Sequence, residues 1–139
     1  MFHFEEGEVF LIDKPLDWTS FDAVNLIRSV IKRYHGIRKL KVGHAGTLDP
    51  LATGLLIICT GRMTKQIDNF QAQEKVYTGT LLLGQTTPTF DMESEADAFY
   101  PIDGITIEMM EEARKKFIGE ILQRPPKFSA IKINGKRAF

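Results

Sequence analysis

The sequence predicts an α+β fold in which a mixed or antiparallel sheet is flanked by helices. Two observations carry this prediction. Short runs rich in strand formers lie at residues 8–13 and 55–59, and apolar side chains recur at helical spacing in residues 20–34 and 106–117. The chain has 139 residues, of which 43% are hydrophobic and 26% charged, as is typical of one globular domain or a part of one.

The first expected elements are a strand, a turn and a helix. The strand at residues 8–13 must end near Pro15, because proline cannot donate a hydrogen bond to a central ladder. Thr19 or Ser20 is a suitable N-cap for a helix over residues 20–34. The residues expected on the apolar face of that helix are Phe21, Val24, Ile27, Ile31 and Tyr34.

The middle of the chain alternates between strand and helix signals. The continuous apolar run at 55–59 predicts a strand buried on both faces, and residues 64–70 are expected to form a short helix. Alternating residues at 74–84 predict a half-buried strand. The acidic stretch at 91–104 is expected to be a surface excursion, followed by a helix over 106–117. The apolar face of that last helix would hold Ile107, Met110, Ala113 and Phe117.

The C-terminal residues contain a hairpin signal. Asn134-Gly135 favours a two-residue turn with positive φ, and only four residues follow it. A hairpin with so short a returning arm is expected where a chain has been cut through a domain. We therefore expect an exposed sheet edge, with association or partial disorder near the C-terminus.

Charge is balanced overall but unevenly distributed. The 18 basic and 18 acidic residues cancel, which argues against a uniformly basic nucleic-acid binder. Residues 28–41 nevertheless carry six Lys or Arg and no acid, residues 91–112 carry eight acids and no base, and residues 114–137 carry eight bases and one acid. Such blocks form either a basic face for phosphates or ordinary solvated surfaces, and the sequence favours neither.

Cysteine and histidine usage favours neither disulfide nor metal chemistry. The single cysteine, Cys59, lies in an apolar run and is expected to be a buried structural thiol. His3, His35 and His44 are scattered without the spacing of metal ligands, so we expect no metal. No basic-apolar leader opens the sequence and no apolar run reaches membrane-spanning length, so a cytoplasmic protein is expected.

The strongest candidate for chemistry is Asp49, which precedes the apolar run at 55–59. Nearby glycines give the backbone freedom, and Pro50 fixes the direction in which Asp49 presents its carboxylate. A rigid loop of this kind can aim a carboxylate at a substrate. The competing interpretation is that Asp49 caps backbone N–H groups in a turn, which is the commoner use of an Asp-Pro pair.

The segment GHAGTLDPLATGLL, residues 43–56, resembles the catalytic motif of the TruB family of pseudouridine synthases, which isomerise uridine in the T-loop of tRNA. The resemblance implies that Asp49 is the catalytic residue and that His44 lies beside a base flipped out of the RNA. It further implies that Tyr77, in a matching K-x-Y segment, stacks on that base and transfers a proton. No cofactor or metal is implied.

Other segments carry the same resemblance. Lys14-Pro15 before Thr19-Ser20 is similar to the first family motif, and residues 125–139 are similar to a segment that opens a basic insertion gripping the tRNA. Residues implied to support the catalytic loop are Lys14, Pro15, Gly46, Thr47, Leu48 and Pro50. Possible RNA contacts are Lys65, Lys127, Lys132, Lys136 and Arg137.

The expected whole is therefore a partial catalytic domain over residues 1–139, interrupted near the start of the RNA-gripping insertion at about 120–139. Its implied partner is the T-arm of tRNA, and the full-length enzyme is expected to be monomeric. Two other hypotheses stay open: a non-catalytic RNA-binding fragment without turnover, and an unrelated hydrolase that uses Asp49 as nucleophile or base.

Overall fold

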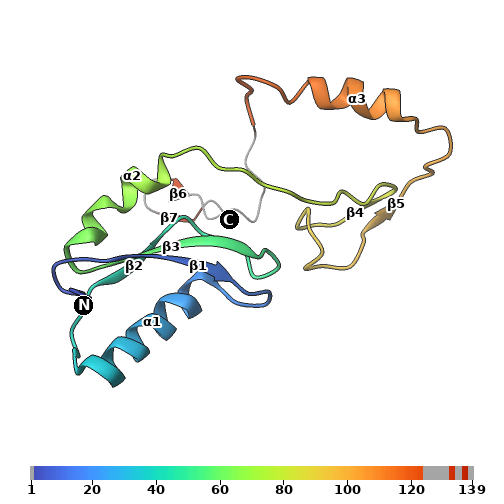
Figure 1. Ribbon diagram of the computed structural model, residues 1–139. Coiled ribbons are helices and arrows are strands. Elements are labelled where there is room, and N and C mark those ends of the chain that lie inside the picture. The colour runs from blue at the N-terminus through green and yellow to red at the C-terminus, as the bar shows by residue number, and fades with distance from the viewer. Residues whose placement is uncertain (1, 124–131, 134–135, 138–139) are drawn as a thin grey trace. The chain divides into compact units, whose positions relative to one another are not determined.

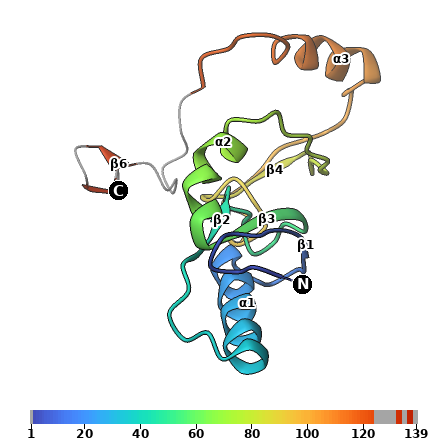
Figure 2. The same ribbon diagram turned by 60° about the vertical axis from the view of Figure 1, so that its left-hand side comes forward.

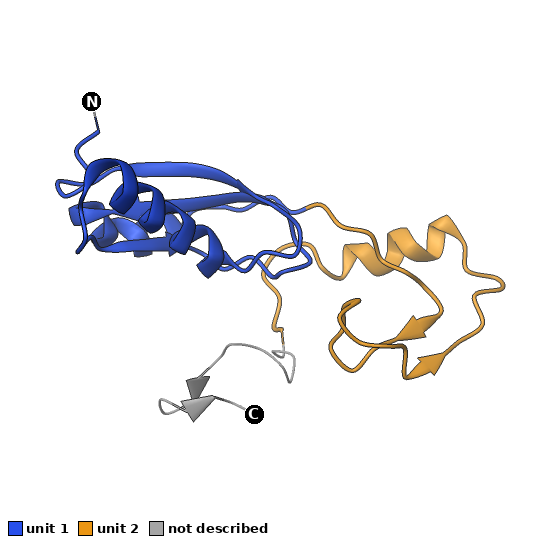
Figure 3. Cartoon of the chain, turned by 90° about the horizontal axis from the view of Figure 1, so that it is seen from below, with its two compact units in different colours: residues 1–77 blue, residues 78–139 orange. Residues whose placement is uncertain are grey.

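The computed structural model describes all residues except 1, 124–131, 134–135 and 138–139 (Figure 1). It divides the chain into two compact units, unit 1 at Met1–Tyr77 and unit 2 at Thr78–Phe139 (Figure 3). The elements are helices and antiparallel strands, which confirms the predicted α+β class.

Unit 1 is built on a three-stranded antiparallel sheet. Strands β1 (Val9–Lys14), β2 (Val42–Ala45) and β3 (Gly54–Thr60) lie in the order β1-β3-β2. In the register, Val9 is opposite Cys59 and Lys14 opposite Gly54, while Ala45 is opposite Ile57. The strands predicted at 8–13 and 55–59 are confirmed, and β3 is the central strand that joins the other two.

Helix α1 (Ser20–His35) covers one face of this sheet, as Figure 1 shows. Its N-terminus is a capping box, in which the Thr19 hydroxyl accepts from the Asp22 N–H and the Asp22 carboxylate accepts from the Thr19 N–H. Gly36 ends the helix with a left-handed φ of 69° and donates its N–H to the Lys32 carbonyl. The helix predicted from periodicity is confirmed almost to the residue.

The core of unit 1 lies between α1 and the sheet. Leu56 and Ile58 on β3 are fully buried, and burying each such side chain stabilises the fold by roughly 1.5–3 kcal/mol. The cluster consists of Ala23, Val24, Val42, Leu56 and Ile58, with Phe10, Ile12, Ile27, Leu40 and Leu48 packed against it.

Two predictions about burial are wrong. Leu55 on β3 is 63% exposed, because α1 covers the sheet face that carries Leu56 and Ile58 rather than the face that carries Leu55. Phe21 and Tyr34, expected on the apolar face of α1, are exposed. Phe21 lies at the margin of the helical stripe that faces the sheet, and Tyr34 lies in the last turn of the helix.

After β3 the chain forms a 3₁₀ helix, η1 (Gly61–Gln66), and a short α-helix, α2 (Ile67–Gln71). The helix predicted at 64–70 is thus confirmed, although its first turns are 3₁₀ and begin at Gly61. Gly61 has a φ of 52°, and its N–H donates to the Lys41 carbonyl at 2.9 Å. That bond joins the start of η1 to the chain just before β2.

The strand predicted at residues 74–84 is absent from the structure. This stretch has no regular secondary structure, and its residues up to Leu83 are exposed. A strand requires a hydrogen-bonded neighbour, and no strand among the described residues pairs with this segment. Alternation alone was therefore not enough to form a strand here.

Unit 2 contains two small ladders and one helix. Strands β4 (Gln85–Thr86) and β5 (Ala98–Phe99) pair antiparallel, as do β6 (Lys132–Ile133) and β7 (Lys136–Arg137). The ladder of β6 and β7 lies on either side of the turn predicted at 134–135, which itself falls outside the described residues. The acidic excursion expected at 91–104 is irregular except for β5, which lies within it.

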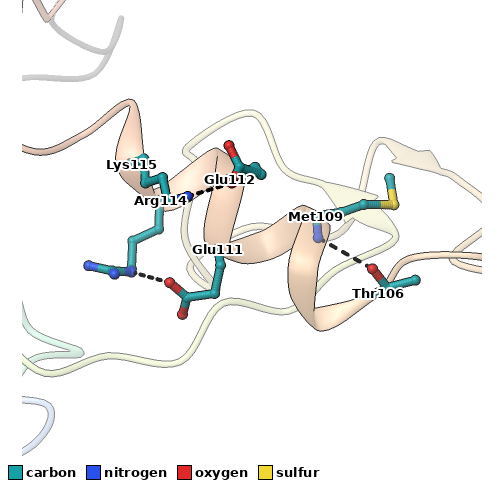
Figure 4. Close-up of polar contacts among 6 residues, drawn as sticks. All are labelled: Thr106, Met109, Glu111, Glu112, Arg114 and Lys115. Carbon is teal, nitrogen blue, oxygen red and sulfur yellow. Dashed lines mark hydrogen bonds and ion pairs between the residues drawn. The ribbon is translucent and has the colours of Figure 1, made fainter.

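Helix α3 (Ile107–Lys115) confirms the helix predicted at 106–117 and is slightly shorter. The Thr106 hydroxyl caps it by accepting from the Met109 N–H, and ion pairs join Glu111 to Arg114 and Glu112 to Lys115 (Figure 4). The residues expected on its apolar face, Ile107, Met110, Ala113 and Phe117, are all exposed.

Within the part of the chain that the structure describes, no helix combines the length and the apolarity needed to cross a membrane.

Candidate active site

The loop at residues 46–53 joins β2 to β3 and presents Asp49 to solvent. The backbone carbonyl of Asp49 accepts the Ala52 N–H at 3.0 Å, so the turn is closed by main-chain atoms. Among the described residues no hydrogen bond reaches the Asp49 carboxylate. The geometry therefore differs from the capping interpretation, in which the carboxylate itself would accept backbone N–H groups.

Leu48, immediately before Asp49, is held by a buried hydroxyl at the start of α1. Ser20 is 3% exposed, and its Oγ accepts the Leu48 N–H at 2.9 Å and donates to the Leu48 carbonyl at 3.1 Å. The Leu48 side chain also packs against the core. One hydroxyl thus satisfies both polar groups of the residue and fixes its orientation.

Pro50, immediately after Asp49, is held from the turn between β1 and α1. Its carbonyl accepts the Asp17 N–H at 2.9 Å and lies 3.5 Å from the Lys14 ammonium. Asp17 adopts a φ of 63°, a left-handed conformation that costs about 1–3 kcal/mol in a residue other than glycine. The fold therefore maintains a strained backbone position that supports this loop.

The Lys14 side chain is fully buried, which is rare for lysine. Its ammonium donates to the carbonyls of Pro15 at 2.9 Å and Trp18 at 2.6 Å, in addition to that of Pro50. Three carbonyls match the three N–H donors of an ammonium group, which is how a buried charge is kept without a carboxylate partner. Lys14 thus joins the β1–α1 turn to the Asp49 loop.

Asp49 consequently lies between two residues that are both held from the segment 14–20. Ser20 holds Leu48, while Asp17 and Lys14 hold Pro50. A group that must reach a reacting atom benefits from such support, because a displacement of about 1 Å can reduce a rate by two orders of magnitude. The arrangement gives Asp49 a fixed backbone and an exposed carboxylate.

His44 lies on β2, five residues before Asp49, and is half-buried. Its Nδ1 is 2.6 Å from the carbonyl of Gly46, a residue with a φ of 99°. Since a carbonyl can only accept, Nδ1 carries the proton and Nε2 of the neutral ring is an acceptor. The ring is thus oriented by the start of the same loop.

The other residues predicted for the site differ in how they are placed. Tyr77 is 73% exposed and lies in the segment without regular structure, and Lys65 is exposed on η1. Thr47 is exposed within the Asp49 loop itself. Lys132, Lys136 and Arg137 lie on β6 and β7, whose side chains are not described, and Lys127 falls outside the described residues.

Sequence reasoning missed the specific roles of Ser20 and Asp17. Thr19-Ser20 stood out as a motif and a helix cap, but nothing in the sequence connects Ser20 to Leu48, 28 residues away. The only signal for Asp17 was its place in a turn between a strand and a capped helix. Both contacts depend on how β1, α1 and the loop pack together.

Metal-ligating side chains and the single thiol are placed as follows. Among the described residues there is no group of three or more His, Cys, Asp or Glu side chains that could hold a metal ion. Cys59 is buried on β3, and burial raises the pKa of its thiol, which disfavours the reactive thiolate. The chemistry that the site offers is that of one carboxylate, as nucleophile or base, beside an oriented imidazole.

Comparison with known proteins gives a consistent match. Residues 32–139 match the family model of the TruB family pseudouridylate synthase N-terminal domain. The chain is 61% identical over 137 residues to the tRNA pseudouridine synthase B of Phocaeicola vulgatus, covering 99% of this chain and 58% of the relative.

Two further relatives carry the same name. The protein of Parabacteroides distasonis is 58% identical over 136 residues, covering 98% of this chain and 58% of the relative. That of Flavobacterium johnsoniae is 53% identical over 135 residues, covering 96% of this chain and 59% of the relative. The chain therefore spans just under three-fifths of the length of these relatives.

Proposed function

Because this chain belongs to the TruB family of pseudouridylate synthases, we propose that the whole protein converts uridine to pseudouridine in the T-loop of tRNA. The chain would be the N-terminal part of that enzyme, a partial catalytic domain interrupted near residues 120–139, and the complete enzyme would act as a monomer in the cytoplasm. The relatives with which it shares more than half of its residues are named for this activity on tRNA.

The reaction breaks the N1–C1′ glycosidic bond, turns the base and joins C5 to C1′. In the proposal the uridine is flipped out of the RNA, since its reacting atoms are inaccessible in the stack. The Asp49 carboxylate starts the reaction, either by attacking C1′ or by removing the C2′ proton. Both routes require an ionised carboxylate at neutral pH.

The other two side chains would position the base. His44 would lie beside the flipped uracil, with its Nε2 available as an acceptor because Nδ1 is engaged by Gly46. Tyr77 would stack on the base and take part in proton transfer at C5, and its 73% exposure leaves the ring available for such contact. Neither role requires a cofactor.

One observation carries the assignment of Asp49. Its carboxylate is exposed and receives no hydrogen bond from the described residues, while its neighbours Leu48 and Pro50 are both held by the segment 14–20. A carboxylate used only to stabilise its loop would have internal partners. Here the hydrogen bonds instead hold the backbone of the residues before and after Asp49.

Tritium release from 5-tritiated uridine in a T-arm RNA tests the proposal. A version of the protein extended to the length of its relatives should release tritium, and Asp49→Asn should lower the rate by a factor of about 10² to 10⁴ or more. Asp13→Asn, which removes an exposed carboxylate on β1, serves as the matched control and should leave the rate unchanged. Turnover that survives Asp49→Asn would overturn the assignment.

The same assay on the 139-residue chain addresses the competing hypothesis of a non-catalytic RNA-binding fragment. Salt-sensitive RNA binding without tritium release by this chain would favour that hypothesis for the fragment. It would leave the proposal for the extended enzyme unchanged, since the two proteins are measured separately.

A further inference from the structure

We propose that unit 1 carries a second RNA contact, a phosphate-binding basic surface at the end of α1 remote from Asp49. This inference rests on the proposed RNA substrate and goes beyond it by naming where the RNA backbone lies. The basic surface consists of Lys32, Arg33, Arg38, Lys39, Lys41 and Arg62, all of which are exposed.

Main-chain and side-chain hydrogen bonds bring the segments that carry these residues together. The Arg28 guanidinium donates to the Val42 carbonyl at 2.8 Å, which fixes the second half of α1 beside the start of β2. The Gly61 N–H donates to the Lys41 carbonyl at 2.9 Å, which brings the start of η1 to the same place. Figure 2 shows the connection between α1 and β2 as an open loop of unit 1. The basic surface is thus assembled from three segments on a fixed scaffold.

The cations of this surface are not held in ion pairs among the described residues. Residues 28–41 contain no acidic residue, and no ion pair among the described residues involves any of the six side chains. The bases of α3 behave differently, because Arg114 and Lys115 are paired with glutamates one turn away (Figure 4). Unpaired cations clustered on a protein of zero net charge create a local field that favours a polyanion.

An exposed aromatic ring lies among these cations. Tyr34 is 71% exposed, and the Arg33 guanidinium lies 5.6 Å from the centre of its ring. Cations interleaved with an exposed aromatic ring form a stacking platform of the kind used to bind nucleic acids. This feature favours RNA over a protein partner with an acidic surface.

The basic surface and the Asp49 loop lie at opposite ends of α1. Ser20, at the start of the helix, holds Leu48, whereas Lys32 and Arg33 are in its last turn. A helix of 16 residues is about 24 Å long, so the two sites would contact the RNA at well-separated places. The basic surface would therefore contribute to binding the RNA and not to the chemical step.

Salt-dependent RNA binding by the 139-residue chain tests the inference. The variant Arg38→Gln/Lys39→Gln/Lys41→Gln removes three cations from the connection between α1 and β2, outside any helix. The control Arg114→Gln/Lys115→Gln/Lys116→Gln removes the same charge from α3 and its end, where two of the three bases are already paired. Fluorescence anisotropy with an unmodified tRNA transcript, from about 50 to 200 mM salt, gives affinity and salt slope for each protein.

The surface variant should lower the slope of log K against log salt by about 3, because each lost phosphate contact reduces the slope by about 1. The control variant should change this slope by less than about 1. The surface variant should lose the same salt slope with an unrelated RNA hairpin as with the tRNA transcript, because phosphate contacts carry no sequence information.

The inference would be overturned if the surface variant and the unaltered chain had equal salt slopes, or if the α3 control lost as much salt slope as the surface variant. It would also be overturned if the unaltered chain bound no RNA. Circular dichroism on both variants excludes unfolding as the cause of a loss. The proposed function is judged separately by tritium release from the extended enzyme. Normal turnover together with unchanged slopes would reject the basic surface and keep the proposed function.

Discussion

The position of Asp49 depends on a few individual residues. Ser20 contacts both polar groups of Leu48, and Lys14 and Asp17 share the Pro50 carbonyl. Each of these supports is a side-chain or backbone group that is buried or conformationally strained, so each is costly to replace. The catalytic carboxylate of the proposal is thus held through its neighbours.

At this scale, Ser20→Ala should destabilise the fold by about 1–3 kcal/mol, because the Leu48 N–H loses its acceptor. Urea unfolding of the 139-residue chain measures this, with Ser29→Ala as a control on the exposed side of the same helix. In the extended enzyme, Ser20→Ala should lower kcat more than it raises KM, since the backbone before Asp49 is loosened. Equal stability of the two variants would show that the Ser20 hydroxyl does not support the loop.

Cys59 gives a second prediction for a single residue. Burial raises the pKa of its thiol, so both access and thiolate content are low in the folded state. A thiol reagent at pH 8 should react slowly with the native chain and quickly in denaturant, with one thiol titrated in total. Fast reaction in the native state would mean that β3 opens readily.

At the scale of elements, α1 is the clearest case of local determination. Its capping box, apolar stripe and C-terminal glycine all lie within 20 residues of sequence, and the structure follows them. By contrast, the segment at 74–84 has strand-like alternation but no neighbouring strand to pair with. A helix satisfies its own backbone groups, whereas a strand depends on another part of the chain.

The capping box of α1 should make stability depend on pH. The hydrogen bonds from the Thr19 hydroxyl and N–H hold the pKa of Asp22 below its ordinary value of 3.8. A lowered folded-state pKa adds stability that is present above pH 3.8 and is lost as the pH falls through the folded-state value.

Thermal unfolding between pH 2 and 6 tests this. On acidification the Tm of the unaltered 139-residue chain should fall more steeply than the Tm of the Asp22→Asn variant. Asp13→Asn is the matched control, because no hydrogen bond to its carboxylate is described, and it should follow the unaltered chain. If the dependence of Tm on pH were the same for Asp22→Asn and for Asp13→Asn, the capping box would not contribute to the pH dependence of stability.

At the scale of the whole molecule, the two units differ in how well they are packed. Every buried hydrophobic side chain among the described residues lies in unit 1, while the apolar side chains of α3 are exposed. Hydrophobic burial is the main source of stability, so unit 1 should dominate the cooperative unfolding of the chain.

Limited proteolysis tests this difference. Chymotrypsin should cleave first after Tyr77, Leu81 or Leu82, which are exposed and lie in a segment without regular secondary structure. The resulting fragment of about 77 residues should persist and keep its helical circular dichroism signal. Early cuts within unit 1, at Phe21 or Tyr34 on α1, would contradict a stable unit 1.

The amino-acid sequence by itself determined the α+β class, the bounds of α1 and the motif around Asp49, because periodicity, capping and motif spacing are properties of neighbouring residues. Only the tertiary structure decided that β3 is the central strand, that the stretch at 74–84 forms no strand, and that Lys14 at the end of β1 and Ser20 at the start of α1 contact the Asp49 loop. Those features depend on which residues distant in the sequence come into contact, as Ser20 does with Leu48 and Lys14 with Pro50. Such contacts depend on which surfaces pack together, and no local pattern encodes them.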